Sequence, residues 1–408
     1  MKILVVSPHF PTPDIYKDIS NDPRSKFLLT YIMEWELEGH QITVLHIPPK
    51  YPKLFSILIF LLGNFKGKLK SKYSRYIQHP DSVKENKLLF SHYTIFRIPL
   101  AKYIPHSEYS RFQLKRLAKR VRKYINNIEI EFDVVIFDYL SPSLRLLDFF
   151  DFSEKTKIYF IPHQTDVNYI NNGLNRYKKS LMSVDGLLFR SSALKKIFSP
   201  LLGDSKETYS MYSGIPNSTV LANPKSKVSK FLYVGTLRKS KNIHNTIYAI
   251  SNLRGQFPQI VFDIIGTGEY EEELRSLVVK LKLSDSVRFL GKLSHEKVLE
   301  VMKDYDSLVM VSKETFGMVY IEAMSQGLVV VAAAGEGIDG VVNSGINGYL
   351  VQLNDQVGLE SCLSMLISDK CGIVKNVSSK ALETASSMKN SMLAKNLINR
   401  ISTTNGIN

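Results

Sequence analysis

Two acidic side chains eight positions apart give the chain its clearest chemical signal. Glu314 and Glu322 stand on either side of the pair Phe316-Gly317. Carboxylates accept hydrogen bonds from neighbouring hydroxyl groups, so two of them at this spacing are suited to hold two sugar rings of one ligand. Because a carboxylate repels phosphate, these glutamates are expected to bind the hydroxyl groups of a sugar nucleotide and not its phosphates.

The residues around these glutamates predict a strand, a tight turn and a helix. Residues 308–311 form a short unbroken apolar run, typical of a parallel strand buried on both faces. Ile321, Met324 and Ser325 fall at helical spacing, so a helix is expected after Gly317. A helix start at the carboxyl edge of a sheet presents free N–H groups and the positive end of the helix dipole, where diphosphates bind.

The same segment resembles the signature of a known enzyme family. Glu314-x7-Glu322 with Phe316-Gly317, followed by Glu322-Ala-Met-x-x-Gly327, is similar to the motif of the retaining family 4 glycosyltransferases of GT-B fold. The resemblance implies an α/β chain with two Rossmann-like doubly wound domains facing across a cleft. It also implies that Glu314 binds the donor sugar and Glu322 the ribose, and that neither attacks the sugar covalently.

A second group of candidate residues follows the strand predicted at residues 230–235. The strand ends in Gly235, and Lys241 stands six residues later, near the expected start of a helix. The resemblance implies that Lys241 binds the donor phosphates. The arginine that the family often has directly after the glycine is Thr236 here, and Arg238 is the candidate that replaces it.

Two further loops complete the expected donor site. Gly266 and Gly268 follow a strand predicted at residues 261–265, and Leu290 lies near the end of the next one. Their place at strand ends predicts backbone contacts with the base and ribose. The expected donor-binding residues are Gly235, Gly266, Gly268, Leu290, Phe316, Gly317, Met318, Val319 and Glu322.

The expected reaction moves a sugar from a UDP-, GDP- or other nucleotide diphosphate sugar to an acceptor, with retention at the anomeric carbon. Lys241, Arg238 and the helix start at 317–319 would stabilise the departing diphosphate, so neither a metal nor a cofactor is expected. Asp304 and Asp306 match an Asp-x-Asp metal motif but are interpreted as a boundary between helix and strand. The expected catalytic residues are His163, Glu314, Lys241 and Arg238.

The amino-terminal half predicts a first doubly wound domain. Residues 2–7 and 42–46 read as strands on either side of a helix at 27–38. Another predicted strand runs into Pro-His163-Gln-Thr-Asp166, which places an imidazole and a carboxylate at a strand end. The resemblance implies that His163 lies near the reacting sugar, and a structural role is the alternative.

A polar linker predicts the domain limits. The first loop, in addition, departs from the family pattern. We predict an acceptor domain at 1–220, a donor domain at 221–375 and a helical segment at 376–408, and the resemblance implies that this segment crosses back to the first domain. The Gly-Gly pair usual in the family's first loop is absent, and Arg24 is the candidate phosphate ligand there, with an ordinary helix-capping loop as the alternative. Glu336 is a candidate for the donor sugar, with a turn role as the alternative.

Composition restricts the class of protein. A chain of 408 residues with 44% apolar residues fits two or three globular domains, and its two cysteines fit a reducing compartment. No segment reaches the roughly 18–20 apolar residues that cross a bilayer, and the sequence opens on a strand and not on a signal peptide. A cytoplasmic protein is expected.

The net charge of +15 lies almost wholly within residues 50–123, which hold 18 Lys and Arg but three acidic residues. Residues 54–62 are strongly apolar with lysines on both sides, as in a helix lying in a membrane interface or in a core helix with basic ends. Residues 111–123 predict an amphipathic helix with a cationic face. We therefore expect a glycan or lipid-linked acceptor, as in bacterial surface polysaccharide assembly, and contact with the inner membrane face.

Two other functions stay open. An epimerase or a phosphorylase is the enzymatic alternative on the same fold, and a basic nucleic-acid-binding protein is the alternative without catalysis. Nucleic acid is not an expected partner, because the sequence contains no recognisable nucleic-acid-binding module.

Overall fold

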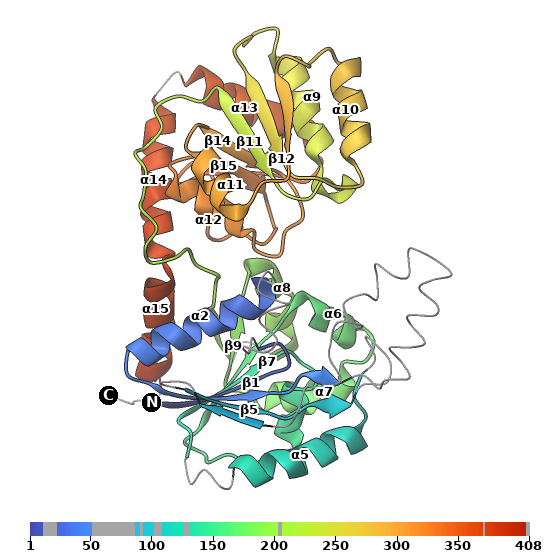
Figure 1. Ribbon diagram of the computed structural model, residues 1–408, viewed down its shortest axis with the longest axis vertical. Coiled ribbons are helices and arrows are strands. Elements are labelled where there is room, and N and C mark those ends of the chain that lie inside the picture. The colour runs from blue at the N-terminus through green and yellow to red at the C-terminus, as the bar shows by residue number, and fades with distance from the viewer. Residues whose placement is uncertain are drawn as a thin grey trace. The chain divides into compact units, whose positions relative to one another are not determined.

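The computed structural model divides the chain into two compact units. Unit 1 consists of Met1–Phe189, Ile197–Ser210 and Ala394–Asn408, and unit 2 of Arg190–Lys196 and Met211–Leu393 (Figure 1). The residues that the structure describes are 1–10, 23–50, 86–89, 93–101, 108–125, 131–202, 206–369 and 372–404. The side chain of Arg24 and the apolar run 54–62 lie outside them.

Unit 1 is built on an eight-stranded sheet. The order is β10-β9-β8-β7-β1-β2-β5-β4, and all the neighbouring strands are parallel except the antiparallel pair β4 and β5. Apolar residues of β1, β2 and β7 are buried in unbroken runs, because helices cover both faces of the sheet. The strands are β1 (Lys2–Ser7), β2 (Gln41–His46), β4 (Asn86–Leu89), β5 (Tyr93–Arg97), β7 (Val134–Asp138), β8 (Lys157–Ile161), β9 (Gly186–Phe189) and β10 (Glu207–Ser210).

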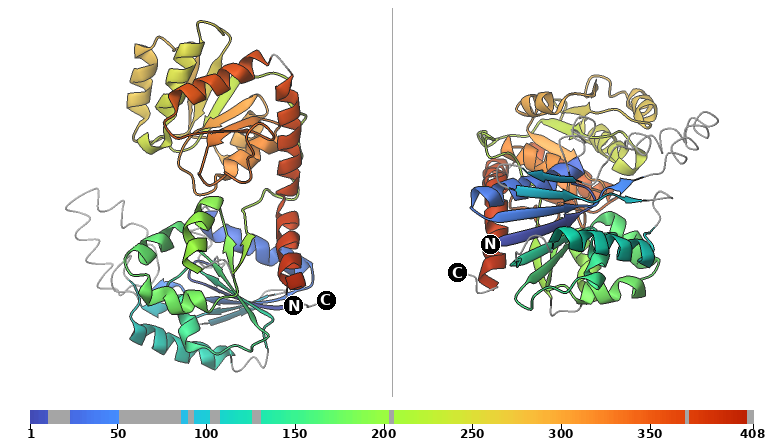
Figure 2. Two further views of the ribbon diagram at one scale, coloured as in Figure 1. Left: turned by 180° about the vertical axis from the view of Figure 1, so that it is seen from behind. Right: turned by 60° about the horizontal axis from the view of Figure 1, so that its bottom comes forward.

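Helices of unit 1 lie on the two faces of this sheet, with α2 and α15 on one and α5 and α7 on the other (Figure 1). The buried indole of Trp35 in α2 donates to the carbonyl of Ala394 in α15 at 3.0 Å. Figure 2 shows α15 beside the amino-terminal strands. The helices are α2 (Pro23–Leu37), α5 (Arg111–Ile125), η1 (Leu144–Phe149), α6 (Gln164–Asn171), α7 (Asn175–Met182), α8 (Ser192–Leu202) and α15 (Asn390–Thr404); a small separate sheet pairs β3 (Pro49–Lys50) with β6 (Leu100–Ala101).

Unit 2 has a six-stranded parallel sheet in the order β13-β12-β11-β14-β15-β16. One layer of helices contains α9, α10 and α13, and the other contains α11, α12 and α14. The strands are β11 (Lys230–Val234), β12 (Val261–Ile265), β13 (Val287–Gly291), β14 (Ser307–Met310), β15 (Val329–Ala333) and β16 (Tyr349–Val351). The helices are η2 (Lys239–Lys241), α9 (Ile243–Leu253), α10 (Glu271–Lys280), α11 (His295–Met302), α12 (Met318–Ser325), α13 (Gln356–Ser368) and α14 (Ile373–Ser387).

Both units are doubly wound α/β sheets, so the predicted fold class is confirmed. The helical segment predicted at 376–408 contains most of α14 and all of α15. At the break between the two helices, the Ile215 N–H donates to the Met388 carbonyl and the Ile215 carbonyl accepts from the Asn390 N–H, both at 3.0 Å. Asp306 stands at a strand start, as interpreted from the sequence, and its Oδ2 accepts from the N–H groups of Ser229 and Lys230 at 2.9 Å.

The strand order fixes where ligands are expected in each unit. In a doubly wound sheet the strand order reverses at one point, and a crevice opens there at the carboxyl ends of the strands. The reversal lies between β1 and β7 in unit 1 and between β11 and β14 in unit 2.

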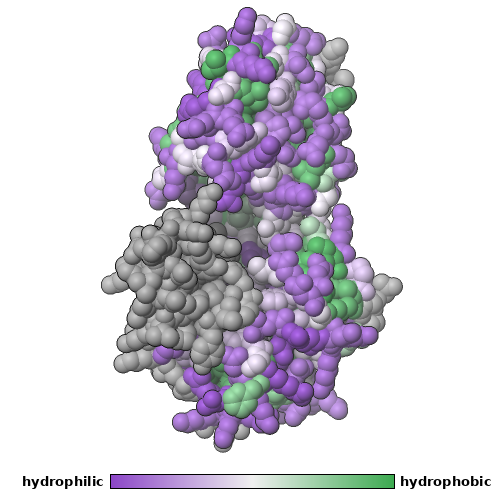
Figure 3. Space-filling model, turned by 90° about the vertical axis from the view of Figure 1, so that its right-hand side faces the viewer, coloured by the Kyte–Doolittle hydropathy of each residue, from purple (hydrophilic) through white to green (hydrophobic). Residues whose placement is uncertain are grey.

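Within the described residues, no helix is long and apolar enough to cross a membrane. The face drawn in Figure 3 is mostly hydrophilic, with scattered hydrophobic patches.

Candidate active site

An ion pair joins the two loops at the reversal point of unit 2. Lys241, after β11, donates from Nζ to Glu314 Oε1, after β14, at 2.5 Å. The same ammonium donates to the Lys313 carbonyl at 3.2 Å, and Ser312 Oγ donates to Glu314 Oε1 at 3.2 Å. The two side chains are 22% and 18% exposed, so the pair is partly desolvated yet within reach of a ligand. Two residues predicted for the site from separate motifs are therefore in direct contact.

Gly317 sets the start of α12 beside this ion pair. Its φ is +84°, a conformation that residues with a Cβ rarely adopt, and a Cβ there would lie 2.4 Å from the Tyr320 ring. Tyr320 is buried and donates from its hydroxyl to the Met310 carbonyl at 2.6 Å, which ties α12 back to β14. Burial raises the pKa of Tyr320 well above its usual value. The glycine thus lets the first turn of the helix, with Met318 and Val319, begin close to the strand end.

Glu322 lies one turn further along α12 and has a partner that the sequence did not suggest. Its Oε1 lies 2.8 Å from His295 Nε2, at the first residue of α11. The glutamate side chain is 14% exposed and the histidine 66%. Phe316 is buried and stacks on Tyr212, with ring centroids 5.2 Å apart.

The predicted glycines bring three loops into close contact. A Cβ on Gly266 would lie 1.8 Å from the Gly235 carbonyl oxygen, and one on Gly268 would lie 2.1 Å from the Leu237 carbonyl oxygen. Gly266 also donates to the Gly291 carbonyl at 2.8 Å. Loop packing alone therefore requires glycine at these positions, and their contact with a nucleotide stays a prediction.

The remaining candidates of unit 2 are Arg238, Leu290 and Glu336. Arg238 is exposed, as is Thr236, and the guanidinium has no partner among the described residues. Leu290 is 37% exposed at the end of β13. Glu336 stands in a turn that packs on the Glu314 loop, because the next residue, Gly337, donates to the Glu314 carbonyl at 3.0 Å.

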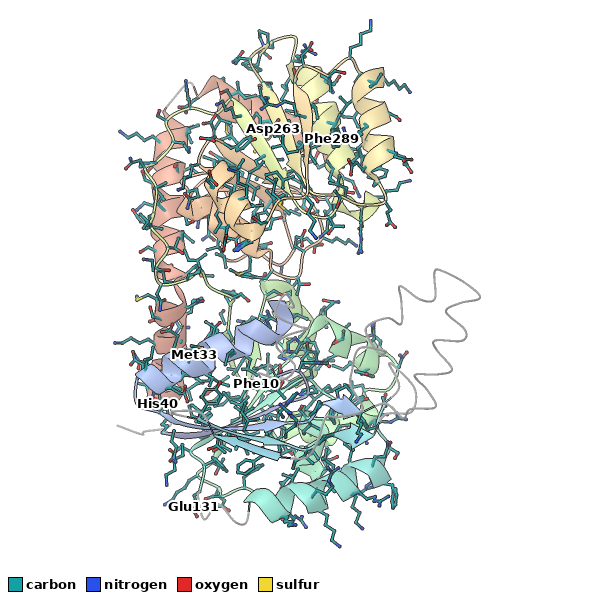
Figure 4. The ribbon with its side chains drawn as sticks, in the orientation of Figure 1. Phe10, Met33, His40, Glu131, Asp263 and Phe289 are labelled. Carbon is teal, nitrogen blue, oxygen red and sulfur yellow. The ribbon has the colours of Figure 1, made fainter. Side chains whose placement is uncertain are left out.

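A buried carboxylate that the sequence analysis did not single out joins β12 to β13. Asp263 is 1% exposed and accepts two hydrogen bonds from Arg288, at 2.7 and 2.6 Å. It also accepts from the Tyr305 hydroxyl. Asp263 and Phe289, labelled in Figure 4, come from these neighbouring strands, and Arg275 lies 4.4 Å above the Phe289 ring. The side-chain hydrogen bonds between Asp263 and Arg288 connect the edge strand β13 to β12.

His163 follows β8 in unit 1, next to β7, one of the two strands at the reversal point. Its Nε2 is 2.6 Å from Asp138 Oδ1, at the end of β7, and its ring stacks on Tyr139. The sequence predicted an imidazole and a carboxylate at this strand end, and both His163 and Asp166 follow β8. Asp166 accepts from the backbone N–H groups of His163 and Leu140, at 2.9 and 3.2 Å, and burial raises the pKa of Asp166 to about 6.

Sequence comparison gives matches to glycosyltransferases. Residues 221–384 match the family model described as glycosyl transferases group 1. A glycogen synthase of Mycobacterium tuberculosis is 25% identical over 247 residues, 56% of this chain and 58% of the relative, so the match spans just over half of that protein. An N-acetyl-alpha-D-glucosaminyl L-malate synthase of Bacillus anthracis is 22% identical over 313 residues, 73% of this chain and 79% of the relative.

Solved structures with the same fold cover nearly the whole chain. A sucrose-phosphate synthase from Thermosynechococcus elongatus has a TM-score of 0.65 and 17% identity over all of both chains. The lipopolysaccharide outer core galactosyltransferase WaaB has a TM-score of 0.67 and 16% identity, over 99% of this chain and 100% of the other. Anabaena HepE in complex with UDP has a TM-score of 0.63 and 17% identity, with the same coverage. The chain therefore has the GT-B fold, and its residues 221–384 are similar to the glycosyl transferases group 1 family.

Proposed function

We propose that this protein is a retaining glycosyltransferase that moves a sugar from a nucleotide diphosphate sugar to a glycan or lipid-linked acceptor in surface polysaccharide biosynthesis. The observation that carries the proposal is the pair of Lys241 and Glu314 at the reversal point of unit 2, beside the helix start at Gly317. Relatives named as glycogen synthase and galactosyltransferase support it, as does the UDP complex of Anabaena HepE.

The ion pair suggests how the donor is bound. A diphosphate carries more negative charge than Glu314, so it competes for the Lys241 ammonium. Once the ammonium contacts phosphate, the Glu314 carboxylate is released to accept hydrogen bonds from hydroxyls of the donor sugar. Arg238 and the N–H groups of the first turn of α12 add positive potential as the diphosphate departs. These groups supply the charge that a metal ion supplies in other transferases, so the reaction is proposed to need no metal.

The other candidates have positioning roles in this proposal. Glu322 holds the ribose hydroxyls, and His295 yields or shares its hydrogen bond when the nucleotide binds. His163 lies near the reacting sugar. Neither Glu314 nor Glu322 forms a covalent intermediate with the sugar in this proposal. Backbone groups of Gly235, Gly266 and Gly268 contact the nucleotide.

A panel of nucleotide sugars tests the proposal. Saturating donor stabilises the protein that binds it, by about 2.7 kcal/mol at a hundred times the Kd, so thermal midpoints identify the donor. Lys241→Met removes a charge-assisted contact worth about 1.5–3 kcal/mol, so the Kd for the nucleotide is expected to rise on the order of tenfold or more. Lys380→Met is the matched control, because Lys380 pairs with Glu383 on the exposed face of α14.

Product analysis separates the possible reactions. Sugar transfer that needs an added glycan or lipid-linked acceptor, survives EDTA and keeps the anomeric configuration supports the proposal. Epimerised or free sugar formed without acceptor identifies an epimerase or phosphorylase. The absence of a thermal shift with every nucleotide sugar, or equal nucleotide binding by Lys241→Met and Lys380→Met, contradicts the proposal.

The outer face of α5 supports a peripheral contact with an anionic membrane. The helix has no acidic residue, and Phe112 is 67% exposed among its cations, with Arg116 5.5 Å above its ring. Cations and an aromatic ring on one exposed face fit the headgroup region of anionic lipids. The exposed residues of α5 are Arg111, Phe112, Lys115, Arg116, Lys119, Arg122 and Lys123.

Vesicle sedimentation tests this contact. Binding is expected with vesicles of phosphatidylcholine and phosphatidylglycerol but not with phosphatidylcholine alone. The double variant Lys115→Glu/Lys119→Glu is expected to abolish it, and the charge-matched Lys195→Glu/Lys196→Glu, on exposed positions of α8, is expected to keep it. Equal binding by both double variants refutes a contact through α5, and tighter binding to RNA than to anionic vesicles favours a nucleic-acid partner.

A further inference from the structure

The carboxylate of Asp138 has one partner on each side of its strand. Oδ1 lies 2.6 Å from Nε2 of His163, which follows β8, and Oδ2 accepts from Oγ of Ser7, at the end of β1, at 2.6 Å. Asp138 is 4% exposed. A carboxylate oxygen accepts hydrogen bonds, so this contact favours the tautomer of His163 that carries its proton on Nε2. Asp138 thereby fixes both the tautomer and the direction of the imidazole.

The next residue holds the face of the same ring. Tyr139 stacks on His163 with centroids 3.7 Å apart and planes 4° from parallel. Its backbone has a φ of +68°, which is rare for a residue with a Cβ. The His9 ring packs edge-on against the Tyr139 ring, with centroids 4.8 Å apart. A strained backbone that persists beside a buried polar group is typical of a functional site.

Backbone contacts immobilise the two loops that carry this arrangement. Asp166 accepts from the N–H groups of His163 and Leu140, so one buried carboxylate joins the loop after β8 to the loop after β7. His163 and Asp166 also form the capping box at the start of α6. The imidazole is therefore held at its Nε2 atom, at its face and at its backbone, while 8% of the residue stays exposed.

We propose that Asp138 is a positioning residue of the transferase, acting through His163, with Ser7 as its second support. This inference rests on the proposed function. Asp138 holds the imidazole in one tautomer and one orientation, so that its exposed edge is already placed when a substrate rich in hydroxyl groups arrives. Ser7 binds the second carboxylate oxygen and prevents Asp138 from rotating away from the ring. None of these contacts was visible in the sequence, because Ser7, Asp138 and His163 are far apart in the chain.

Asp138→Asn and a matched control test the proposal in the full-length chain. The control is Asp133→Asn. Asp133 directly precedes the first residue of β7, and its Oδ2 accepts from the Lys2 N–H at 2.7 Å. Nitrogen NMR of labelled histidine reports the His163 tautomer without any substrate. In Asp138→Asn the resonances of the second tautomer are expected to appear, and in Asp133→Asn the spectrum is expected to match the wild type.

Steady-state kinetics with the active donor give the second readout. Misplacement of a catalytic group costs on the order of a hundredfold in rate, so kcat of Asp138→Asn is expected to fall by about that factor while KM for the donor changes less than about threefold. Ser7→Ala, which removes one hydroxyl, is expected to lie between the wild type and Asp138→Asn and serves in its place if Asp138→Asn does not fold.

The two readouts separate the possible failures. An unchanged His163 tautomer in Asp138→Asn and in Ser7→Ala overturns the inference, whatever the activity. So does a changed tautomer with unchanged kcat, because His163 orientation would then not matter to the reaction. If the wild-type protein transfers no sugar, the proposed function fails, and the NMR comparison still shows whether Asp138 fixes the ring.

Discussion

Replacing Gly317 by alanine tests whether the proposed nucleotide binding near Glu314 depends on the left-handed backbone conformation at Gly317, just before α12. The new Cβ costs roughly 1–2 kcal/mol in the backbone conformation at φ +84°. It also lies 2.4 Å from the buried Tyr320 ring, and overpacking of this kind costs about 1–3 kcal/mol. Movement of the ring weakens the hydrogen bond from Tyr320 to the Met310 carbonyl, worth about 1 kcal/mol.

The expected total is about 2–4 kcal/mol, because the ring can relax partly and the three costs overlap. For a unit of this size the thermal midpoint falls on the order of 10 °C. Calorimetry measures this change, and titration with the donor nucleotide measures the accompanying loss of affinity. Gly255→Ala is the control, because a Cβ there meets nothing within 4 Å and its φ is not in the left-handed region.

The comparison of the two variants decides the question. The control is expected to melt within about 1 °C of the wild type, since surface substitutions change stability by less than about 0.5 kcal/mol. A Gly317→Ala protein that melts with the control and binds nucleotide as tightly as the wild type refutes the reasoning. Loss of stability with unchanged nucleotide affinity removes only the link between this turn and the donor.

Two further substitutions test buried carboxyl groups. Burial raises the pKa of Glu36 from 4.5 to about 7, and its Oε1 has no hydrogen-bond partner among the residues that the structure describes. The unfolded chain therefore loses this proton first, and the group's contribution to stability falls as the pH rises from about 4.5 to about 7. Glu36→Gln is expected to raise the thermal midpoint at pH 8 and to change it little at pH 4; the same gain at both pH values contradicts this cause. Asp263→Asn weakens the bonds from Arg288 and Tyr305, which should lower the free energy of unfolding by about 1.5–3 kcal/mol in urea titrations, and a change below about 0.5 kcal/mol contradicts that estimate.

Local patterns in the sequence were enough to predict the fold class and the strand, turn and helix around Glu314 and Glu322. The strands at 2–7 and 261–265 begin and end where the sequence predicts. Glu314, Gly317 and the helix that follows them were also readable, because a strand, a turn and a helix are determined by neighbouring residues. The sequence assigned Lys241 and Glu314 to one site, but the contact between them, across 73 positions of the chain, came from the structure.

Only the tertiary structure decided which distant groups meet. His163 was visible, yet the contact of its ring with Asp138 was not, because it depends on β7 and β8 lying side by side in the sheet. Glu322 pairs with His295 for the same kind of reason, since α11 packs against α12. The spacing of a motif determines the element that carries it, whereas strand order and helix packing determine which side chains from different elements come within hydrogen-bonding distance.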